Sequence, residues 1–349
     1  RPVGTLAGGC VGWIVVVAER GAALPVPGVA WGTGVLAIGA LAVLCVAGAV
    51  VAPRLLRSRR VGLLTGLATV AVLLGVPGRF DALPGPFGGA WPPDDWLLAA
   101  CDVGQGDALV LSAGPGAAVV VDAGPDPAAV DRCLDRLDVE QVPLLVLTHF
   151  HADHVDGLTG VLRGRRVGAV EASPMLDPTT GHDRVEATLA SAGLAVTPTA
   201  YGEARSIGDL TLQVLWPDLP GPVAGPGDGS AANDASVVLL VETHGLRILL
   251  TGDVEPHAQA RLAAALPGLD VDVLKVPHHG SSHQDEEWLT SLDAEVAFVS
   301  VGADNDYGHP DRGLLDLLAA GGTTVARTDR DGALAVTAGE AGPAVVTAD

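Results

Sequence analysis

The sequence has almost no lysine and very little cysteine. Nineteen of its twenty basic residues are Arg, and only Lys275 is Lys. The four cysteines lie far apart and form no C-x-x-C pair: Cys10, Cys45, Cys101 and Cys133. This spacing excludes a zinc ribbon and a dense disulfide framework. The chemistry of the protein must therefore rest on other residue types.

Two common catalytic or cofactor-binding motifs are absent as well. No G-x-S-x-G elbow of a serine hydrolase occurs, and Gly104-x-Gly106 lacks the third glycine of a dinucleotide-binding fingerprint, because Leu109 stands there. The chain starts with Arg1 and has no secretory signal peptide with its short apolar stretch and cleavage site. We therefore expect this chain to be the C-terminal part of a longer protein.

Basic charge is scarce in the larger, C-terminal part of the chain. Residues 94–349 carry thirteen basic and thirty-nine acidic residues, a net charge of −26, whereas residues 1–93 carry seven Arg and two acids, a net charge of +5. The C-terminal part is therefore not expected to have the broad basic face that usually grips nucleic acid.

The first 78 residues contain the long apolar runs of the chain. Residues 31–52 are uncharged and long enough, as a helix, to cross a hydrocarbon core of ~30 Å, and residues 61–77 are uncharged near the short limit of about 17 residues. We predict a transmembrane helix in each. Residues 5–18 are also apolar, and we expect an interfacial helix or the end of another span there.

The connector between the two predicted spans fixes their expected orientation. Residues 53–60 contain four Arg, which favours the cytoplasmic side by the positive-inside rule. Everything after Pro77 is then expected outside the cytoplasm, in the cell-wall space or the periplasm. The Gly- and Pro-rich residues 79–93 are predicted to be a linker. The predicted protein is thus a multi-pass cell-membrane protein with an external domain over residues 94–349.

The external domain alternates short aliphatic strands with Ala- and Leu-rich helices, which is typical of an α/β fold. Residues 217–233 are rich in Gly and Pro and are predicted to lack regular structure. The first predicted elements are strands at 96–100, 108–112, 118–122 and 144–148 and a helix at 127–137.

Four potential metal ligands follow the apolar strand that ends at Thr148. His149 and His151 alternate along the chain and point to one side, where they can bind one metal ion. Asp153 and His154 come directly after them and can turn toward a second ion. Four donors within six residues are strong evidence for a metal site.

Two later strands also end in potential ligands. The strand at 246–251 leads to Gly252-Asp253, and a carboxylate at a strand end beside glycine can bridge two cations. The strand at 271–277 leads to His278-His279-Gly280, a pattern compatible with a metal or phosphate site. Two cations lower the pKa of a shared water and stabilise charge on a phosphoryl or acyl oxygen, so hydrolysis is the expected reaction class.

The order H-x-H-x-D-H, G-D and a late His resembles the metallo-β-lactamase superfamily, whose fold is an αββα sandwich. Further motifs resemble the ComEC family of DNA-internalisation membrane proteins, and the resemblance runs from about residue 96 to the C-terminus. They are Asp102-Val103-Gly104-Gln105-Gly106-Asp107-Ala108, Val121-Asp122-Ala123-Gly124, Asn233-Asp234-Ala235-Ser236-Val237-Val238, Leu250-Thr251-Gly252-Asp253, residues 274–281 and Tyr307-Gly308-His309-Pro310.

This resemblance implies an external domain that degrades DNA, such as the strand not imported during natural transformation. Its implied partners are DNA, the membrane, the preceding transporter region of the same protein and the competence machinery. By motif position, His149 and His151 would hold metal one, Asp153, His154 and His279 would hold metal two, and Asp253 would hold both. Asp153 and Asp253 would thereby take part in catalysis.

One departure from the superfamily pattern concerns metal one. Its usual third ligand is a His before the bridging aspartate, and no His lies between His182 and His244. Asn233-Asp234 stands nearest to that place, so an oxygen of either side chain, Asp234 in particular, is expected as the ligand. Oxygen donors favour Mn²⁺ over Zn²⁺, although both ions remain candidates. Either His278 or His279 can bind, and the position before Gly280 favours His279.

Further polar residues receive supporting roles. Asp102 and Asp122 are expected to orient ligand imidazoles, although each is also compatible with a turn or helix cap. His309, in a loop between Gly308 and Pro310, could protonate the leaving 3′ oxygen or hold a phosphate, and it is also compatible with an ordinary surface-loop histidine. Candidates for phosphate positioning are Ser281, Ser282 and Asn305, whereas His182, His244, His257 and His283 are expected to be structural or exposed.

Two other functions remain open. One is hydrolysis of small extracellular esters or phosphodiesters, because a fold does not fix a substrate. The other is a non-catalytic domain that caps or guides a DNA channel.

Overall fold

The computed structural model describes residues 91–227, 229–339 and 342–348. The predicted membrane segment, with its helices at 31–52 and 61–77 and the apolar residues 5–18, lies outside the described residues, as does most of the predicted linker. Within the described part, no helix has the length and apolar character needed to cross a membrane. The described residues all belong to one compact unit.

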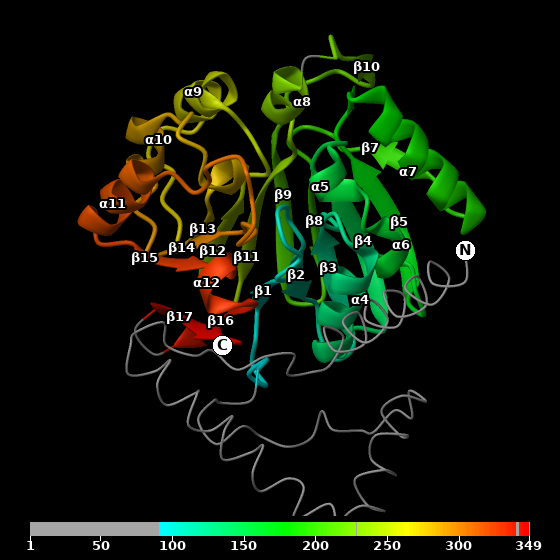
Figure 1. Cartoon of the computed structure of the whole chain (residues 1–349), viewed down its shortest axis with the longest axis horizontal. Helices are drawn as coiled ribbons and strands as arrows, with labels where there is room; N and C mark the ends of the chain where they lie inside the picture. Colours follow the sequence, from blue (N-terminus) through cyan, green and yellow to red (C-terminus); the bar gives the residue numbers. More distant parts are fainter. Residues whose placement is uncertain (1–90, 228, 340–341, 349) are drawn as a thin grey trace, which may run out of the picture. The chain divides into compact units, whose positions relative to one another are not determined.

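Two sheets form the centre of the described part (Figure 1). The first sheet has eight strands, in the order β17 (Gly342–Thr347), β16 (Leu334–Gly339), β1 (Leu98–Ala100), β2 (Leu109–Ser112), β3 (Ala118–Val121), β4 (Gln141–Leu147), β5 (Arg166–Ala172) and β7 (Val196–Pro198). The second has seven, in the order β15 (Thr324–Arg327), β14 (Val296–Val299), β13 (Val273–Lys275), β12 (Leu246–Leu250), β11 (Val238–Thr243), β9 (Leu210–Trp216) and β8 (Ala204–Ile207).

The apolar side chains of the two sheets face each other. Leu98, Leu111 and Val146 of the first sheet belong to the same buried cluster as Ile248 and Phe298 of the second. Burial of this apolar surface stabilises the sandwich by roughly 25 cal/mol per Å². The two sheets therefore form the inner layers of the domain.

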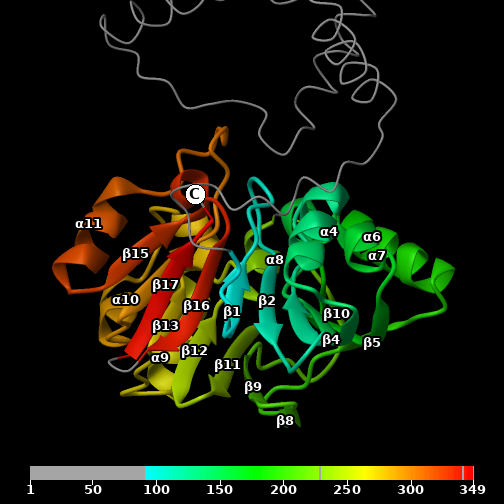
Figure 2. The ribbon, with the colours of Figure 1, turned by 90° about the horizontal axis from the view of Figure 1, so that it is seen from below.

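Helices cover the outer face of each sheet (Figure 2). The first sheet packs against α4 (Pro127–Arg136), α5 (Ala152–Val155), α6 (Leu158–Val161) and α7 (Thr179–Ser191). The second packs against α9 (Pro256–Ala265), α10 (Glu286–Ser291) and α11 (Arg312–Ala320). The order of layers is helix, sheet, sheet, helix, which confirms the predicted αββα sandwich. The shorter elements are β6 (Met175–Leu176), β10 (Val223–Ala224), α8 (Ser230–Asp234), η1 (Pro277–Gly280) and α12 (Thr328–Asp331).

The prediction for residues 217–233 is wrong in part. Strand β10 pairs in parallel with β6, and α8 begins inside this stretch at Ser230. The Asp177 carboxylate accepts a hydrogen bond from the Gly227 amide at 2.9 Å. The Gly- and Pro-rich composition of this stretch did not predict these short elements, because they form through contacts with a distant part of the chain.

Strand direction brings the ends of four strands together. Strands β3 and β4 run parallel, and so do β12 and β13. Because the carboxyl ends of parallel strands lie at the same edge of a sheet, the residues that follow these strands are neighbours. This edge carries all the motifs that the sequence singled out after strands.

Candidate metal centre

Four potential ligands come together at this edge. The donor atoms of Asp153, His154, Asp253 and His279 all lie within 4.8 Å of one another. His154 Nε2 lies 3.2 Å from Asp253 Oδ2, and His279 Nε2 lies 3.3 Å from the Oδ2 atoms of Asp153 and Asp253. Among the described residues, His279 Nε2 is a buried atom without a hydrogen-bond partner. Two imidazoles and two carboxylates around one point fit a divalent transition metal.

The second pair of predicted ligands lies beside this cluster. His149 is buried, and its Nε2 lies 2.9 Å from Nδ1 of the half-buried His151. The rings of His149 and His154 are 4.1 Å apart. The helix α5 begins directly after His151 and carries Asp153 and His154, which both belong to the cluster. The sequence motif thus supplies two adjacent groups of donors.

Neighbouring buried charges shift the pKa values of the clustered side chains. Burial alone would raise the pKa of Asp253, but His279, His154 and Lys275 lower it well below its ordinary value. Burial alone would lower the pKa of His279, but Asp253 and Asp107 raise it to about 9. The same competition raises the pKa of His154, where Asp253 and Asp122 outweigh burial. With protein groups alone, protons occupy the imidazoles that a metal would need.

Asp122 orients one of these imidazoles. Its Oδ2 lies 2.8 Å from His154 Nδ1, and its two oxygens accept hydrogen bonds of 2.7 Å from the amide and hydroxyl of Thr148. His279 is oriented similarly, because its Nδ1 donates to the Ser300 carbonyl at 2.9 Å. In both rings Nε2 is thereby left to face the cluster.

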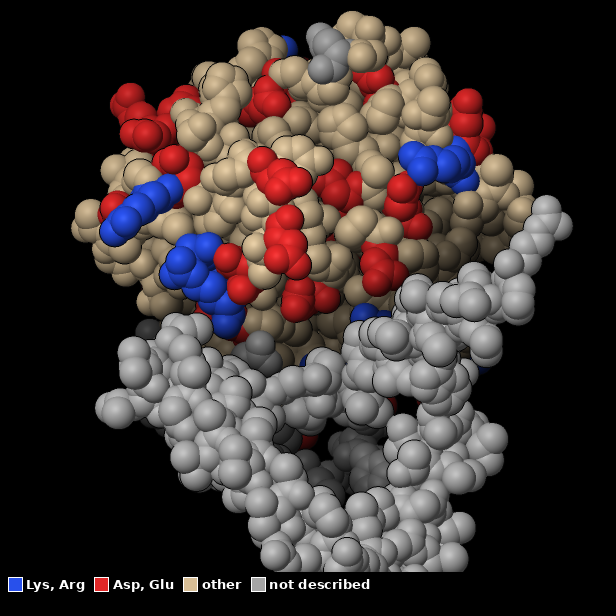
Figure 3. All heavy atoms as spheres, viewed as in Figure 1, with Lys and Arg blue, Asp and Glu red and all other residues tan. Residues whose placement is uncertain are grey.

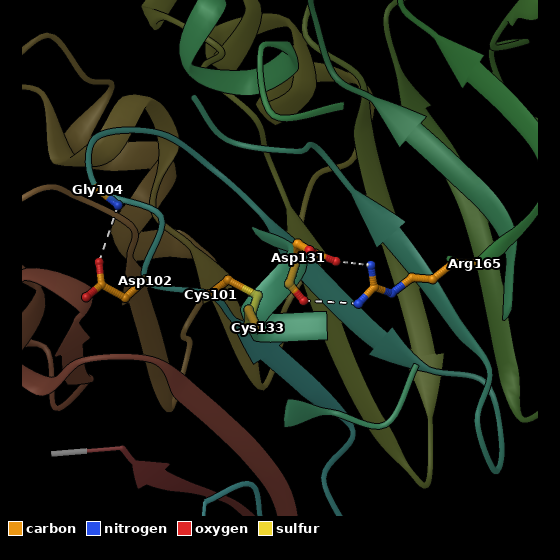
Figure 4. The surroundings of a disulfide bond; sticks show 6 residues. All are labelled: Cys101, Asp102, Gly104, Asp131, Cys133 and Arg165. Atoms are coloured by element: carbon orange, nitrogen blue, oxygen red, sulfur yellow. Dashed lines mark hydrogen bonds and ion pairs between the residues drawn. A yellow bond between two sulfur atoms is a disulfide. The ribbon is translucent and has the colours of Figure 1, made fainter. Parts of the chain in front are cut away.

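Asp102 does not take the corresponding place. It is exposed, and its Oδ1 accepts a hydrogen bond from the Gly104 amide at 3.3 Å (Figure 4). The second aspartate of the same motif, Asp107, is buried instead and lies 3.5 Å from His279 Nδ1 through its Oδ1. The sequence motif contains both aspartates, but the fold directs only the second one inward.

A disulfide fastens the start of this motif. Cys101 and Cys133 are bonded, and the bond joins the residue before Asp102 to helix α4 (Figure 4). The wide separation of the two cysteines in the sequence gave no sign of this pairing. The motif loop is thus held covalently against the helix that covers its sheet.

A buried lysine lies under the cluster and was not predicted. Lys275 Nζ lies 2.5 Å from Asp107 Oδ2 and 3.5 Å from Asp253 Oδ1, and it donates to the Gly252 carbonyl at 3.0 Å. Burial alone would lower the pKa of Lys275, but Asp107 and Asp253 raise it, so the ammonium stays charged. The only lysine of the sequence, at the end of a buried strand, was the signal that could have identified it.

The Asp234 carboxylate, expected from the sequence as the third ligand of metal one, contacts the start of a helix. Its Oδ1 accepts hydrogen bonds from the amides of Glu255 and Ala258 at 3.2 and 3.3 Å, at the start of α9, and its Oδ2 lies 3.4 Å from His257. The carboxylate therefore caps a helix N-terminus. Asn233 is buried, and among the described residues its Oδ1 has no hydrogen-bond partner.

Two further residues that contact predicted site residues were missed. Ser236 Oγ lies 3.2 Å from His149 Nδ1 and accepts a hydrogen bond from the Asp253 amide at 3.1 Å. Glu255 Oε1 accepts from Asn233 Nδ2 at 2.9 Å and lies 3.6 Å from His278 Nδ1. Neither residue type marks a metal site by itself, which is why the sequence did not single them out.

His278 lies beside the cluster. Its Nε2 is 4.0 Å from Asp253 Oδ2, and burial lowers the pKa of its imidazole. Both His278 and His279 have positive φ values, 49° and 54°, so the two side chains diverge. This local backbone directs His279 into the cluster and leaves His278 beside Glu255.

The other predicted substrate residues lie in two loops. Asn305 holds its own loop, because Nδ2 donates to the carbonyls of Gly302 and His309 at 2.7 and 2.9 Å. The Ser281 hydroxyl accepts from the His283 amide at 3.1 Å, and Ser282 is exposed. His309 is half-buried, and its ring centre lies 5.5 Å from that of His278. Burial lowers the pKa of His309, and the nearby His278 lowers it further.

The remaining histidines lie elsewhere. His182 lies on α7, and its ring centre is 5.1 Å from that of Phe150. His244, His257 and His283 are exposed.

Comparison with known protein families identifies a match over most of the described domain. A model described as the Metallo-beta-lactamase superfamily matches residues 101–301. Among solved structures, Zn(2+)-bound PqqB from Methylobacterium extorquens is similar with a TM-score of 0.42 and 13% identity, covering 66% of this chain and 98% of that chain.

Curated competence proteins are also similar in sequence. ComE operon protein 3 of Bacillus subtilis is 31% identical over 197 residues, which cover 56% of this chain and 24% of that protein. Competence protein ComA of Neisseria gonorrhoeae is 26% identical over 259 residues, which cover 72% of this chain and 34% of that protein. These matches confirm the resemblance to ComEC-type proteins, and the chain spans about a quarter to a third of the length of these relatives.

Proposed function

The chain belongs to the metallo-beta-lactamase superfamily, and on that premise we propose that it is the external, metal-dependent nuclease domain of a DNA-uptake membrane protein. Its reaction is hydrolysis of DNA phosphodiesters, for example in the strand that is not imported. The cluster of Asp153, His154, Asp253 and His279 is the observation that carries the proposal. Superfamily members are mostly metal-dependent hydrolases, so this cluster supports the reaction class before the substrate.

Two groups of residues would hold two divalent ions. Asp153, His154 and His279 would hold one, His149 and His151 would hold the other, and Asp253 would serve both. The ions, Mn²⁺ or Zn²⁺, would supply an activated water and neutralise charge on the phosphoryl oxygens.

The surrounding side chains position these ligands and handle the proton. Asp122 and the Ser300 carbonyl fix the rings of His154 and His279 through their Nδ1 atoms. His309, at the rim, donates a proton or a hydrogen bond to the leaving 3′ oxygen. Because its pKa is lowered, this step requires the anionic substrate to stabilise the protonated imidazole.

The names of the similar proteins support DNA uptake as the process. The predicted spans at 31–52 and 61–77, with the Arg-rich connector between them, support a membrane anchor with the hydrolase outside the cytoplasm. The Cys101–Cys133 disulfide supports the same location, because disulfides persist in oxidising compartments. The preceding transporter region and the competence machinery are the partners that this proposal entails.

A small-ester or phosphodiester hydrolase is the second candidate, and surface charge favours it. Acidic side chains run down the middle of the face that Figure 3 shows, whereas basic side chains gather toward its sides. DNA would have to approach this surface through metal ions or a basic partner.

The test compares substrates and variants in one assay. The purified protein receives Mn²⁺ and either linear DNA or a small ester such as bis(p-nitrophenyl) phosphate, beside Asp253→Ala and the exposed-site control Asp270→Ala. We expect the wild type and the control to cleave DNA. Asp253→Ala should lose its bound metal, and its cleavage rate should fall more than about a hundredfold, because losing even a residue that only hydrogen-bonds to a metal ligand costs 10–100-fold. Hydrolysis of the ester alone would select the second candidate, and bound metal without hydrolysis of either substrate would favour a non-catalytic domain.

A further inference from the structure

Two large apolar side chains are exposed in the described part of the chain, and one of them lies near the metal centre. Tyr307 is 73% exposed and Tyr201 is 49% exposed. The Tyr307 ring stacks on the His309 ring with a centroid distance of 6.0 Å and an interplanar angle of 17°. An aromatic face is thus presented to solvent on a loop between β14 and α11, drawn in orange in Figure 1.

A row of rings connects this aromatic face to the metal centre. His309 lies 5.5 Å from His278, ring centre to ring centre, and His278 Nε2 lies 4.0 Å from Asp253 Oδ2. The row therefore runs from Tyr307 through His309 to His278, which lies beside the cluster. That spacing suits a group attached to the reacting phosphate but outside the centre itself.

The loop that carries the two rings is held in place. The Asn305 side chain bonds the carbonyls of Gly302 and His309, and its Oδ1 accepts from the His309 amide at 3.3 Å. The Asp311 amide donates to the Gly280 carbonyl at 2.7 Å, which ties the loop to the His278-His279 segment. A surface fixed in this way loses little conformational entropy when it binds a flat partner.

The charge of the loop disfavours a role in phosphate binding. Asp304, Asp306 and Asp311 lie in the same stretch as Tyr307, and residues 300–311 contain no Lys or Arg. Stacking of a nucleobase on an aromatic ring does not depend on attraction of phosphates and tolerates every base. Contacts of this kind therefore suit an acidic domain that acts on DNA.

We propose that Tyr307 and His309 form a stacking platform for one unpaired nucleobase next to the scissile phosphodiester. This inference rests on the proposed nuclease function and adds a strand preference to it. In a duplex both faces of a base are covered by neighbouring bases, and freeing a base costs a few kcal/mol. The platform accordingly selects single-stranded DNA or frayed ends over intact duplex.

The test measures binding separately from cleavage. Fluorescence anisotropy with a labelled, cleavage-resistant single-stranded oligonucleotide, in the presence of Mn²⁺, gives Kd for the wild type, Tyr307→Ala, Tyr307→Phe and the control Tyr201→Ala. We expect Tyr307→Ala to raise Kd by roughly 5- to 150-fold, the effect of losing one stacked base. Tyr307→Phe and Tyr201→Ala should bind as the wild type does. Equal Kd values for the wild type and Tyr307→Ala, or equal weakening in Tyr201→Ala, would overturn the proposal.

Cleavage in Mn²⁺ then separates this inference from the proposed function. With the single-stranded oligonucleotide, Tyr307→Ala should raise KM, and an abasic site beside the scissile phosphate should remove the difference between variant and wild type. A difference that persists on the abasic substrate would contradict stacking. Cleavage by the wild type without any effect of Tyr307→Ala would refute the platform alone, whereas weakened binding by Tyr307→Ala without cleavage by the wild type would refute only the nuclease.

Discussion

Replacing Lys275 by Met should destabilise the protein strongly. The side chain is fully buried, and its ammonium neutralises Asp107 at 2.5 Å and Asp253 at 3.5 Å. Met keeps most of the volume but leaves both carboxylates without this cation. Removing one partner of a buried ion pair costs about 3–5 kcal/mol, because the other charge remains buried and uncompensated. We expect the free energy of unfolding to fall by that amount.

A double-mutant cycle tests the reasoning. Urea unfolding in the presence of a chelator gives the free energies of the wild type, Lys275→Met, Asp107→Asn and the double variant. If the pair is coupled as its distance indicates, the double variant should be more stable than the sum of the single effects predicts, by about 1–3 kcal/mol. A loss below about 1 kcal/mol in Lys275→Met, or strict additivity, would refute the assignment of this ion pair.

Three further predictions concern metal binding and the motif loop. The pKa of His279 is raised to about 9, and the pKa of His154 is raised as well. Because the metal needs both rings deprotonated, calorimetric Mn²⁺ affinity should rise at least tenfold per pH unit up to about pH 9. An affinity that is flat from pH 7 would contradict this. In Gly106→Ala the new Cβ would lie 2.0 Å from the backbone oxygen of Asp153, so the metal content of this variant should fall. The control Gly104→Ala has open space around the new Cβ and strains only a left-handed backbone, so it should keep far more metal. Equal metal content in the two variants would contradict this prediction. Loss of the Cys101–Cys133 disulfide, which spans 32 residues, should lower the free energy of unfolding by about 3–4 kcal/mol in urea, and no change on reduction would show that the bond does not form.

Strand patterns predicted most of the fold because burial on both faces leaves continuous aliphatic runs. The predicted helix at 127–137 corresponds to α4, which ends one residue earlier, at Arg136. Its start is fixed locally, since Asp126 accepts a hydrogen bond from the Ala128 amide and Pro127 occupies the first position. Such boundaries depend on neighbouring residues and are therefore readable in the sequence.

The clustered ligands were predictable for the same reason. His149, Asp253 and His279 each follow a buried strand, and parallel strands bring their ends together without any knowledge of side-chain contacts. The choice between His278 and His279 depended on two successive left-handed residues. Backbone conformations of that kind are rare for non-glycine residues and cannot be derived from composition.

The structure departs from the expectation at residues whose contacts are made by distant parts of the chain. Asp102 and Asp107 stand in one motif, and the buried one, Asp107, contacts Lys275 and His279 from distant parts of the chain. Asp234 has the right chemistry for a ligand but lies at the N-terminus of α9, where its carboxylate is used as a cap. Local sequence offers no means of distinguishing these alternatives.

The most direct test of the central claim counts metal and cleavage in the same samples. Protein stripped by a chelator receives increasing Mn²⁺, and bound ions and the rate of cleavage of a single-stranded oligonucleotide are measured together. If the cluster of Asp153, His154, Asp253 and His279 is the centre of a two-metal nuclease, cleavage should be absent without metal and should rise with occupancy to two ions per chain. Cleavage by the metal-free protein, or full occupancy without cleavage, would contradict the account.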